Sequence, residues 1–234
     1  MAVRQVTRTR AGVDAGLQGY VRQVFNYMTG GVALSGLVAW LMGSYNGGQL
    51  MVQMIQSGFF WVLLIAQLGL VFFLSFRVQK LQPSTALGLF IGYSALSGAT
   101  LAPLVFAYTQ ASVVTAFFTA AAMFGAMSVW GYTTKKDLSG FGSFLFMGLI
   151  GLIVASVINI FVGSNTMSFV ISLIAVPLFA GLTAYDMQKI KEIYYHTQGD
   201  VAAQSRAAVM GALTLYLDFI NLFIHLLQLM GERR

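Results

Sequence analysis

The chain has 234 residues, of which 58% are hydrophobic and only 9% are charged. A water-soluble domain carries roughly 25% charged residues, so this composition excludes a soluble protein. Cysteine is absent, which excludes disulfides and thiolate metal sites. The formal charge of +6 does not predict nucleic-acid binding, because the basic residues flank apolar stretches as topology signals of membrane proteins do.

Seven apolar stretches approach the ~20 residues that a helix needs to cross ~30 Å of hydrocarbon. We expect membrane-spanning helices over residues 24–43, 57–76, 84–107, 110–132, 139–162, 167–187 and 206–230. The expected fold is an all-α membrane protein. It comprises a cytoplasmic N-terminal arm over 1–23, one seven-helix transmembrane domain over 24–230 and a charged C-terminal tail over 231–234. Gly88 and Gly92 have the spacing that lets helices approach closely.

Lysine and arginine are retained on the cytoplasmic side of a membrane. They are absent from the loops 44–56, 108–109 and 163–166 but present in 77–83, 133–138 and 188–205. We therefore expect the N-terminus in the cytoplasm. The C-terminal tail alone disagrees, since seven complete spans leave Arg233 and Arg234 outside, whereas a re-entrant last segment would return them to the cytoplasm.

Three ionisable residues within the spans carry the functional signal, because each costs on the order of 2.5–3.5 kcal/mol to insert. They are Asp186, Asp218 and His225. Asp218 lies ~18 Å along the last span and therefore needs a partner. Asn221 and His225 follow it at the third and seventh positions, so the three residues form a polar seam on one helix face.

Asp186 stands near the end of the sixth span, but Met187, Ile190 and Ile193 indicate that this helix continues toward His196. Asp186 and Asp218 would then lie at similar depths and could meet. Two carboxylates in contact share a proton, and without that proton they offer the oxygen ligands that calcium prefers. The alternative is that Asp186 caps a helix end near Lys189 or Lys191 and Asp218 bonds to another helix.

Two segments resemble the C-terminal motifs of the Bax inhibitor-1 family, also called the transmembrane Bax-inhibitor-motif family. They are AYDMQKI over residues 184–190 and ALTLYLDFINLF over 212–223. The segment MSVWGYTTKKDLS over 127–139 is similar to the bacterial branch of the family. The resemblance covers residues 20 to 230.

The resemblance implies a last helix that is central and surrounded by the other six. It also implies a pH-sensitive calcium leak of the bacterial inner membrane, gated by a di-aspartyl pair that matches Asp186 and Asp218. Arg77, at the cytoplasmic end of the second span, matches an arginine that latches one aspartate in the family. From the residues alone, its side chain is instead expected to extend to the membrane surface. Calcium and protons are then the ligands, with no further cofactor and no enzymatic activity.

Two other functions remain as alternatives. The bacterial branch associates with a membrane-anchored AAA protease, so the chain could be a non-catalytic regulator that contacts the protease through the N-terminal arm or the 188–205 loop. An intramembrane aspartyl protease also places one aspartate on each of two helices. Such proteases carry Gly-x-Gly immediately before the second aspartate, whereas Asp218 follows Leu215, Tyr216 and Leu217, which argues against peptide hydrolysis.

Overall fold

The computed structural model describes the backbone of residues 2–234 and the side chains from Ala15 onward, apart from residues 46 and 47. Within these residues the helices are α1 (Ala2–Ser44), η1 (Tyr45–Gly48), α2 (Gln49–Gln56), α3 (Phe59–Arg77), η2 (Val78–Lys80), α4 (Pro83–Phe106), α5 (Gln110–Thr133), α6 (Ser139–Val162), α7 (Asn165–His196) and α8 (Val201–Met230). Seven of them, α1 and α3 to α8, are long and apolar enough to cross a membrane. The predicted all-α membrane fold with seven spans is confirmed.

Local side-chain chemistry explains where several helices begin and end. Thr109, Ser164 and Asp200 each precede a helix and accept a hydrogen bond from a backbone N–H in its first turn. These contacts satisfy donors that have no partner within the helix. Helix α6 ends at Gly163, whose positive φ of 67° favours glycine. The connections are therefore short and well defined.

Two helices extend further than hydropathy alone suggests. Helix α1 runs without a break through the expected boundary between arm and membrane at residue 23, and residues 15–23 already belong to its candidate span. Leu17 and Tyr20 are buried, and the Tyr20 ring lies 5.5 Å from that of Tyr194 on α7. Helix α7 continues to His196, as its apolar pattern predicted. The segment of α1 around Tyr20 thus packs against the C-terminal part of α7.

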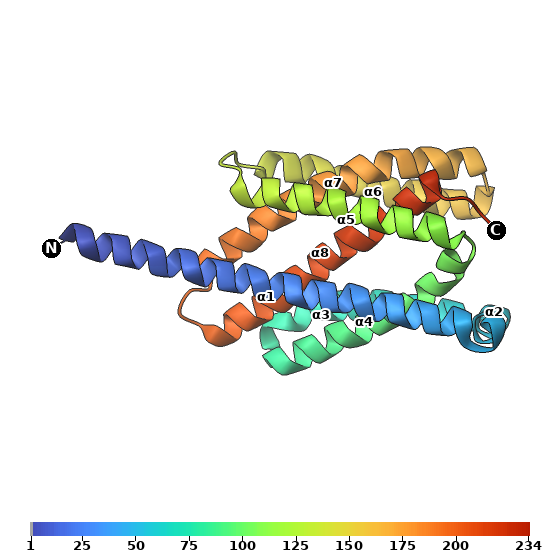
Figure 1. Cartoon of the computed structure of the whole chain (residues 1–234), viewed down its shortest axis with the longest axis horizontal. Helices are drawn as coiled ribbons and strands as arrows, with labels where there is room; N and C mark the ends of the chain where they lie inside the picture. The colour runs from blue at the N-terminus through green and yellow to red at the C-terminus, as the bar shows by residue number, and fades with distance from the viewer. Residues whose placement is uncertain (1) are drawn as a thin grey trace.

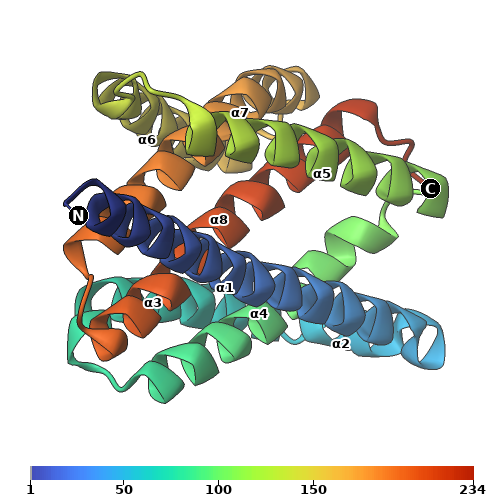
Figure 2. The same ribbon diagram turned by 60° about the vertical axis from the view of Figure 1, so that its left-hand side comes forward.

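Helix α8 crosses the molecule between two groups of helices, one containing α1, α3 and α4 and the other α5, α6 and α7 (Figures 1 and 2). It packs against α1, α4, α5 and α7, whereas α3 packs mainly on α4 and α6 on α7. It also has the largest buried share of the seven spans. The expectation that all six other spans surround α8 is not confirmed, because α3 and α6 lie further out.

The closest helix contacts form at glycines other than the predicted pair. A Cβ atom on Gly98 of α4 would meet the backbone of Ser35 on α1, and one on Gly131 of α5 would meet the backbone of Ala184 on α7. Gly88 and Gly92 face open space instead. Their predicted role in close helix packing is wrong, because spacing alone does not reveal which helix face meets a neighbour.

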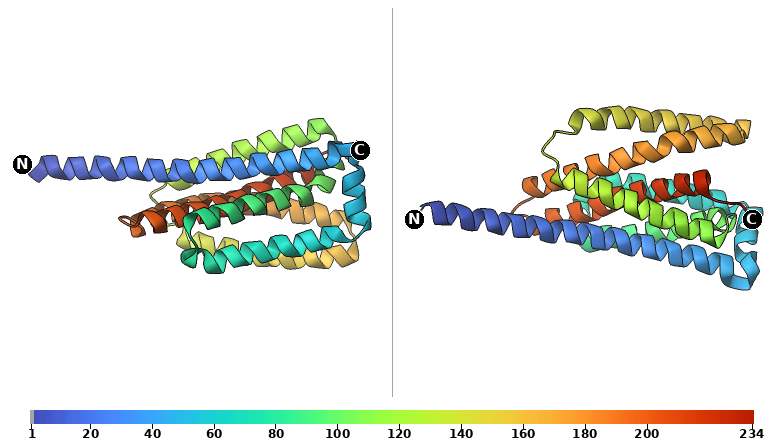
Figure 3. Two further views of the ribbon diagram at one scale, coloured as in Figure 1. Left: turned by 90° about the horizontal axis from the view of Figure 1, so that it is seen from below. Right: turned by 45° about the horizontal axis from the view of Figure 1, so that its top comes forward.

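The C-terminal tail pairs with the connection between α4 and α5. Thr109 donates its backbone N–H to the carbonyl of Glu232 at 2.9 Å, and Arg234 donates to the carbonyl of Ala107 at 3.0 Å. The N- and C-termini lie at opposite ends of the molecule (Figure 3). Helix α8 therefore runs the length of the bundle as a continuous helix, which favours a complete crossing over a re-entrant last segment.

The glycine contacts predict a difference between two substitutions on α4. Gly98→Ala should destabilise the protein by about 1–3 kcal/mol, because the methyl group forces α1 and α4 apart. Gly92→Ala is the matched control and should leave stability unchanged or slightly raised, since its methyl group enters open space. Thermal unfolding in detergent measures both. Equal unfolding temperatures for the two variants would contradict this account of α1 and α4.

The complete crossing of α8 predicts where the tail lies relative to the positively charged loops. The chain has no cysteine, so single-cysteine variants can be labelled without background. A membrane-impermeant maleimide should label Glu232→Cys in spheroplasts but should label Lys135→Cys only after permeabilisation. Labelling of both positions from the same side would contradict the three complete crossings, by α6, α7 and α8, that separate these two positions.

Candidate functional site

Asp186 on α7 and Asp218 on α8 lie in the interface between these two helices, close enough for each carboxyl group to act on the other. Asp218 is buried, with 4% of its surface exposed, and Asp186 is half-buried. Two buried carboxyl groups that lie close together favour sharing one proton over carrying two negative charges. Asp218 Oδ2 is buried and has no hydrogen-bond partner among the described residues. Asp218 therefore keeps one buried carboxyl oxygen that no hydrogen bond from the described residues uses.

Contacts on α7 set the position of Asp186. Two residues before it, the Ala184 backbone packs against Gly131. Two residues after it, Gln188 accepts a hydrogen bond from the Leu138 N–H at 2.9 Å and donates to the Lys136 carbonyl at 2.9 Å. Helix α7 is therefore held against α5 and the 134–138 loop on both sides of the aspartate.

Contacts on α8 likewise set the position of Asp218. Tyr216 is fully buried, and its Oη lies 2.6 Å from the Oγ of Ser35 on α1. Phe219 packs edge-on against Phe117 and Phe124 of α5, with ring centroids 5.5 and 5.6 Å apart. The residues on either side of Asp218 thus bind α8 to α1 and to α5.

The predicted polar seam continues along α8 but has different partners along its length. Asn221 donates to the Leu217 carbonyl of its own helix at 2.8 Å. His225 Nδ1 lies 3.1 Å from the Oγ of Ser172 on α7, and this hydroxyl donates to Gln228 Oε1 at 2.7 Å. Ser172 and Gln228 were not predicted, because serine and glutamine are common in membrane helices and carry no charge to single them out.

The aromatic ring of Phe179 lies between the two aspartates and a second polar group, formed by Ser172, His225 and Gln228. Ser172, Phe179 and Asp186 follow one another at intervals of seven residues on α7, about two turns each, so they share one face. Phe179 is buried and stacks on His225, with ring centroids 6.0 Å apart. The α7–α8 interface therefore places an apolar ring between two polar sites.

Arg77 does not join the aspartates in this structure. It is the last residue of α3 and its side chain is exposed. The cation whose charge acts on Asp186 is Lys189, one turn further along α7. Lys191 instead donates to the Tyr132 carbonyl at 2.9 Å. Asp186 lies well before the end of α7 at His196, so the alternative in which it caps a helix end is wrong.

The side chains offer few ligands for a resident metal ion. Among the described residues, no group of three or more histidine, aspartate or glutamate side chains could hold one. Calcium takes six to eight oxygen ligands in proteins, and Asp186 and Asp218 supply carboxylate oxygens from two residues only. The pair alone therefore supplies too few ligands for a resident calcium ion.

The fold and these contacts define a multi-pass membrane protein with an acidic pair inside its helix bundle. The sequence model of the family described as "Inhibitor of apoptosis-promoting Bax1" matches residues 17–234. The chain belongs to this family, the Bax inhibitor-1 family.

Bacterial relatives match along almost the whole chain. The Escherichia coli K12 protein named "Inner membrane protein YbhL" is 46% identical over 222 residues, which cover 94% of both chains. An uncharacterized protein of Deinococcus radiodurans is 41% identical and covers 99% of this chain and 98% of its own. RP147 of Rickettsia prowazekii, also uncharacterized, is 44% identical and covers 94% and 92%. These likenesses and the seven apolar helices identify a multi-pass inner-membrane protein.

Proposed function

We propose that this protein is a pH-sensitive calcium leak channel of the bacterial inner membrane, gated by protonation of Asp186 and Asp218. The observation that supports the proposal is the proximity of these two acidic side chains within the membrane-spanning bundle. Intramembrane carboxyl groups are costly to insert and commonly mark ion or proton pathways. The residues of the pair come from two adjacent helices, so a change in their protonation acts directly on the α7–α8 interface.

The shared proton gives the pair two states. With the proton present, the two carboxyl groups attract each other and hold α7 against α8. When the proton leaves, two negative charges face each other at short range and repel, and their oxygens become available to a calcium ion. Protons and calcium therefore compete for the same oxygens, so the leak responds to pH.

Phe179 closes the pathway in the conformation described here. Its ring lies between the aspartates and the group formed by Ser172, His225 and Gln228. A bare apolar ring offers no ligand to replace the hydration shell of calcium, so passage requires α7 and α8 to separate. Rings and other hydrophobic constrictions gate channels in this way.

The proposed orientation places the N-terminus in the cytoplasm, with Arg77 on the same side. A latch between Arg77 and an aspartate then requires α3 to move toward α7 and α8. Helix α3 has the smallest buried share of the seven spans and packs mainly against α4, so such a movement disrupts few contacts.

The central test replaces each aspartate by an amide of the same shape. In proteoliposomes loaded with a calcium dye, wild-type leak should change across about pH 5–8, and Asp218→Asn or Asp186→Asn should alter that dependence, because only one titratable carboxyl group remains and no proton is shared between two. An asparagine can also donate a hydrogen bond to the remaining carboxylate, which preserves the helix contact. A wild-type pH response in both variants would overturn the gating proposal.

Asp137→Asn is the matched control for the same chemical change. Asp137 is exposed in the loop between α5 and α6, and hydrogen bonds from the Ser139 hydroxyl and backbone N–H hold the pKa of its carboxyl below the usual range. It therefore stays ionised throughout the tested range, and the pH response of Asp137→Asn should match that of the wild type.

A second test concerns the ring that closes the pathway. Phe179→Ala should raise calcium leak several-fold at every pH, because the space between the two polar sites opens to water. Phe169→Ala is the control on the same helix, since Phe169 is 53% exposed and outside the core, and it should leak as the wild type does. Unchanged leak in a folded Phe179→Ala variant would exclude the ring as the barrier.

A further inference from the structure

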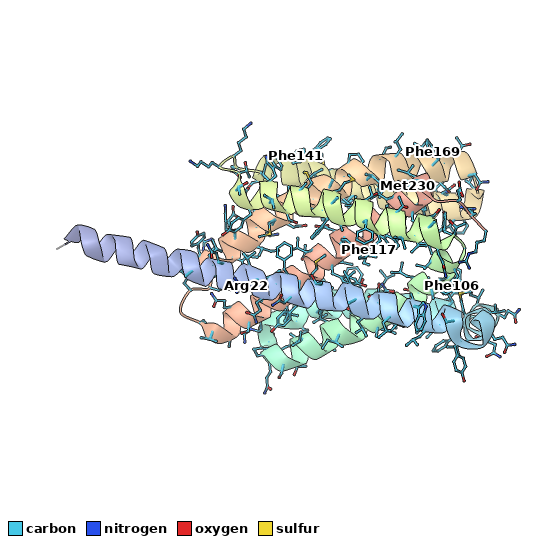
Figure 4. The ribbon with its side chains drawn as sticks, viewed as in Figure 1. Arg22, Phe106, Phe117, Phe141, Phe169 and Met230 are labelled. Atoms are coloured by element: carbon cyan, nitrogen blue, oxygen red, sulfur yellow. The ribbon has the colours of Figure 1, made fainter. Side chains whose placement is uncertain are left out.

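An apolar cavity of about 410 Å³ lies between α1, α4, α5 and α8, in the half of the molecule that contains the C-terminal tail. Its walls are mostly aliphatic and aromatic, and α8 contributes Phe219, Ile220 and Phe223. Figure 4 shows Phe117 in the region between α1 and α5, in front of α8. The cavity takes no part in the proposed calcium pathway, since neither aspartate lines it.

The cavity opens at the protein surface beside Trp40 on α1 and Val114 and Phe118 on α5, which line it and are each more than half exposed. Helix α1 packs on α4 and α8, while α5 packs on α7 and α8, and the two helices stand apart in Figure 1. Lining residues on α5 run from Gln110 to Phe118, which is about 12 Å along the helix axis. One leaflet contributes about half of a ~30 Å hydrocarbon core. The cavity thus spans most of one leaflet.

The polar groups of the cavity gather mainly at its membrane-surface end. Gln110 begins α5, and Arg234 belongs to the tail that pairs with the connection before α5. Trp40 also lines the cavity and is 59% exposed, as is usual for tryptophan at a membrane interface. Glu232, the acidic residue of the tail, is not among the lining residues. The cavity is therefore apolar along its length, and Arg234, whose side chain is exposed, is the basic residue in its lining.

We propose that this cavity binds an acyl chain of an anionic phospholipid, whose phosphate is held by Arg234. The apolar walls suit a hydrocarbon chain, which gains about 0.8 kcal/mol for each buried methylene. A guanidinium matches a phosphate in shape and charge. A neutral phospholipid could fill the apolar part equally, but it carries no net charge to be attracted by the arginine. The site therefore selects anionic over zwitterionic lipid.

Quenching of Trp40 fluorescence measures this selection directly. The protein with Trp61→Phe and Trp130→Phe retains Trp40 as its only tryptophan. In vesicles containing an equal fraction of either brominated phosphatidylglycerol or brominated phosphatidylcholine, Trp40 should be quenched several-fold more effectively by phosphatidylglycerol. A variant that retains only Trp61 is the reference, because Trp61 is 60% exposed on α3 and does not line the cavity. It should show no such preference.

Matched substitutions then locate the selecting group. Arg234→Gln should abolish the preference of Trp40 for phosphatidylglycerol, whereas Arg233→Gln should keep it, because Arg233 lies over the Tyr108 ring and does not line the cavity. Equal quenching of Trp40 by both lipids, quenching by neither, or a preference that persists in Arg234→Gln would each overturn the proposal.

A third pair of variants tests the cavity itself. Gly36 lines it, and a Cβ at this position would meet no atom within 4 Å, so Gly36→Phe fills the space without a clash at the backbone. The lipid preference should be lost in this variant. Gly30→Phe on the same helix is the control, since its Cβ also meets nothing within 4 Å and it does not line the cavity. Retention of the preference in Gly36→Phe would place the lipid elsewhere.

Discussion

A carboxyl group inside a membrane must be kept away from lipid, and this constraint accounts for the position of α8. Asp218 lies in the middle of an apolar helix and is almost fully buried. Because intramembrane acids are costly to expose, α8 packs against α1, α4, α5 and α7 rather than facing the bilayer. Asp186 on the adjacent helix lies close to Asp218 in the same interface, so both acidic groups are kept within the protein.

The sequence predicts the spans for simple physical reasons, and the same reasoning leads to the hypothesis that the two aspartates form a pair. Apolar length decides which segments can cross, and the apolar pattern after Asp186 shows that α7 continues far enough to bring it beside α8. Apolar length and apolar pattern are properties of a single helix, so they can be read without knowing how the helices pack. The expected depths of Asp186 and Asp218 followed from them without knowledge of packing.

Contacts between helices could not be predicted in the same way. Ser172, Phe179 and Gln188 are ordinary residues of an apolar helix, and they become relevant only because α8 and the 134–138 loop face them. Gly98 and Gly131 allow close approach whereas Gly88 and Gly92 do not, although spacing favoured the latter. The place of Arg77 also depends on packing, since a long side chain at a helix end can point outward as well as inward.

The pairing of the C-terminal tail with the connection between α4 and α5 has a mechanical consequence. This connection joins the two groups of helices that flank α8, and the tail holds the end of α8 to it. The two groups and the helix between them are thus joined at one end of the bundle. A rotation of one group relative to the other would have its pivot there, and its displacement would grow with distance toward the loop between α7 and α8.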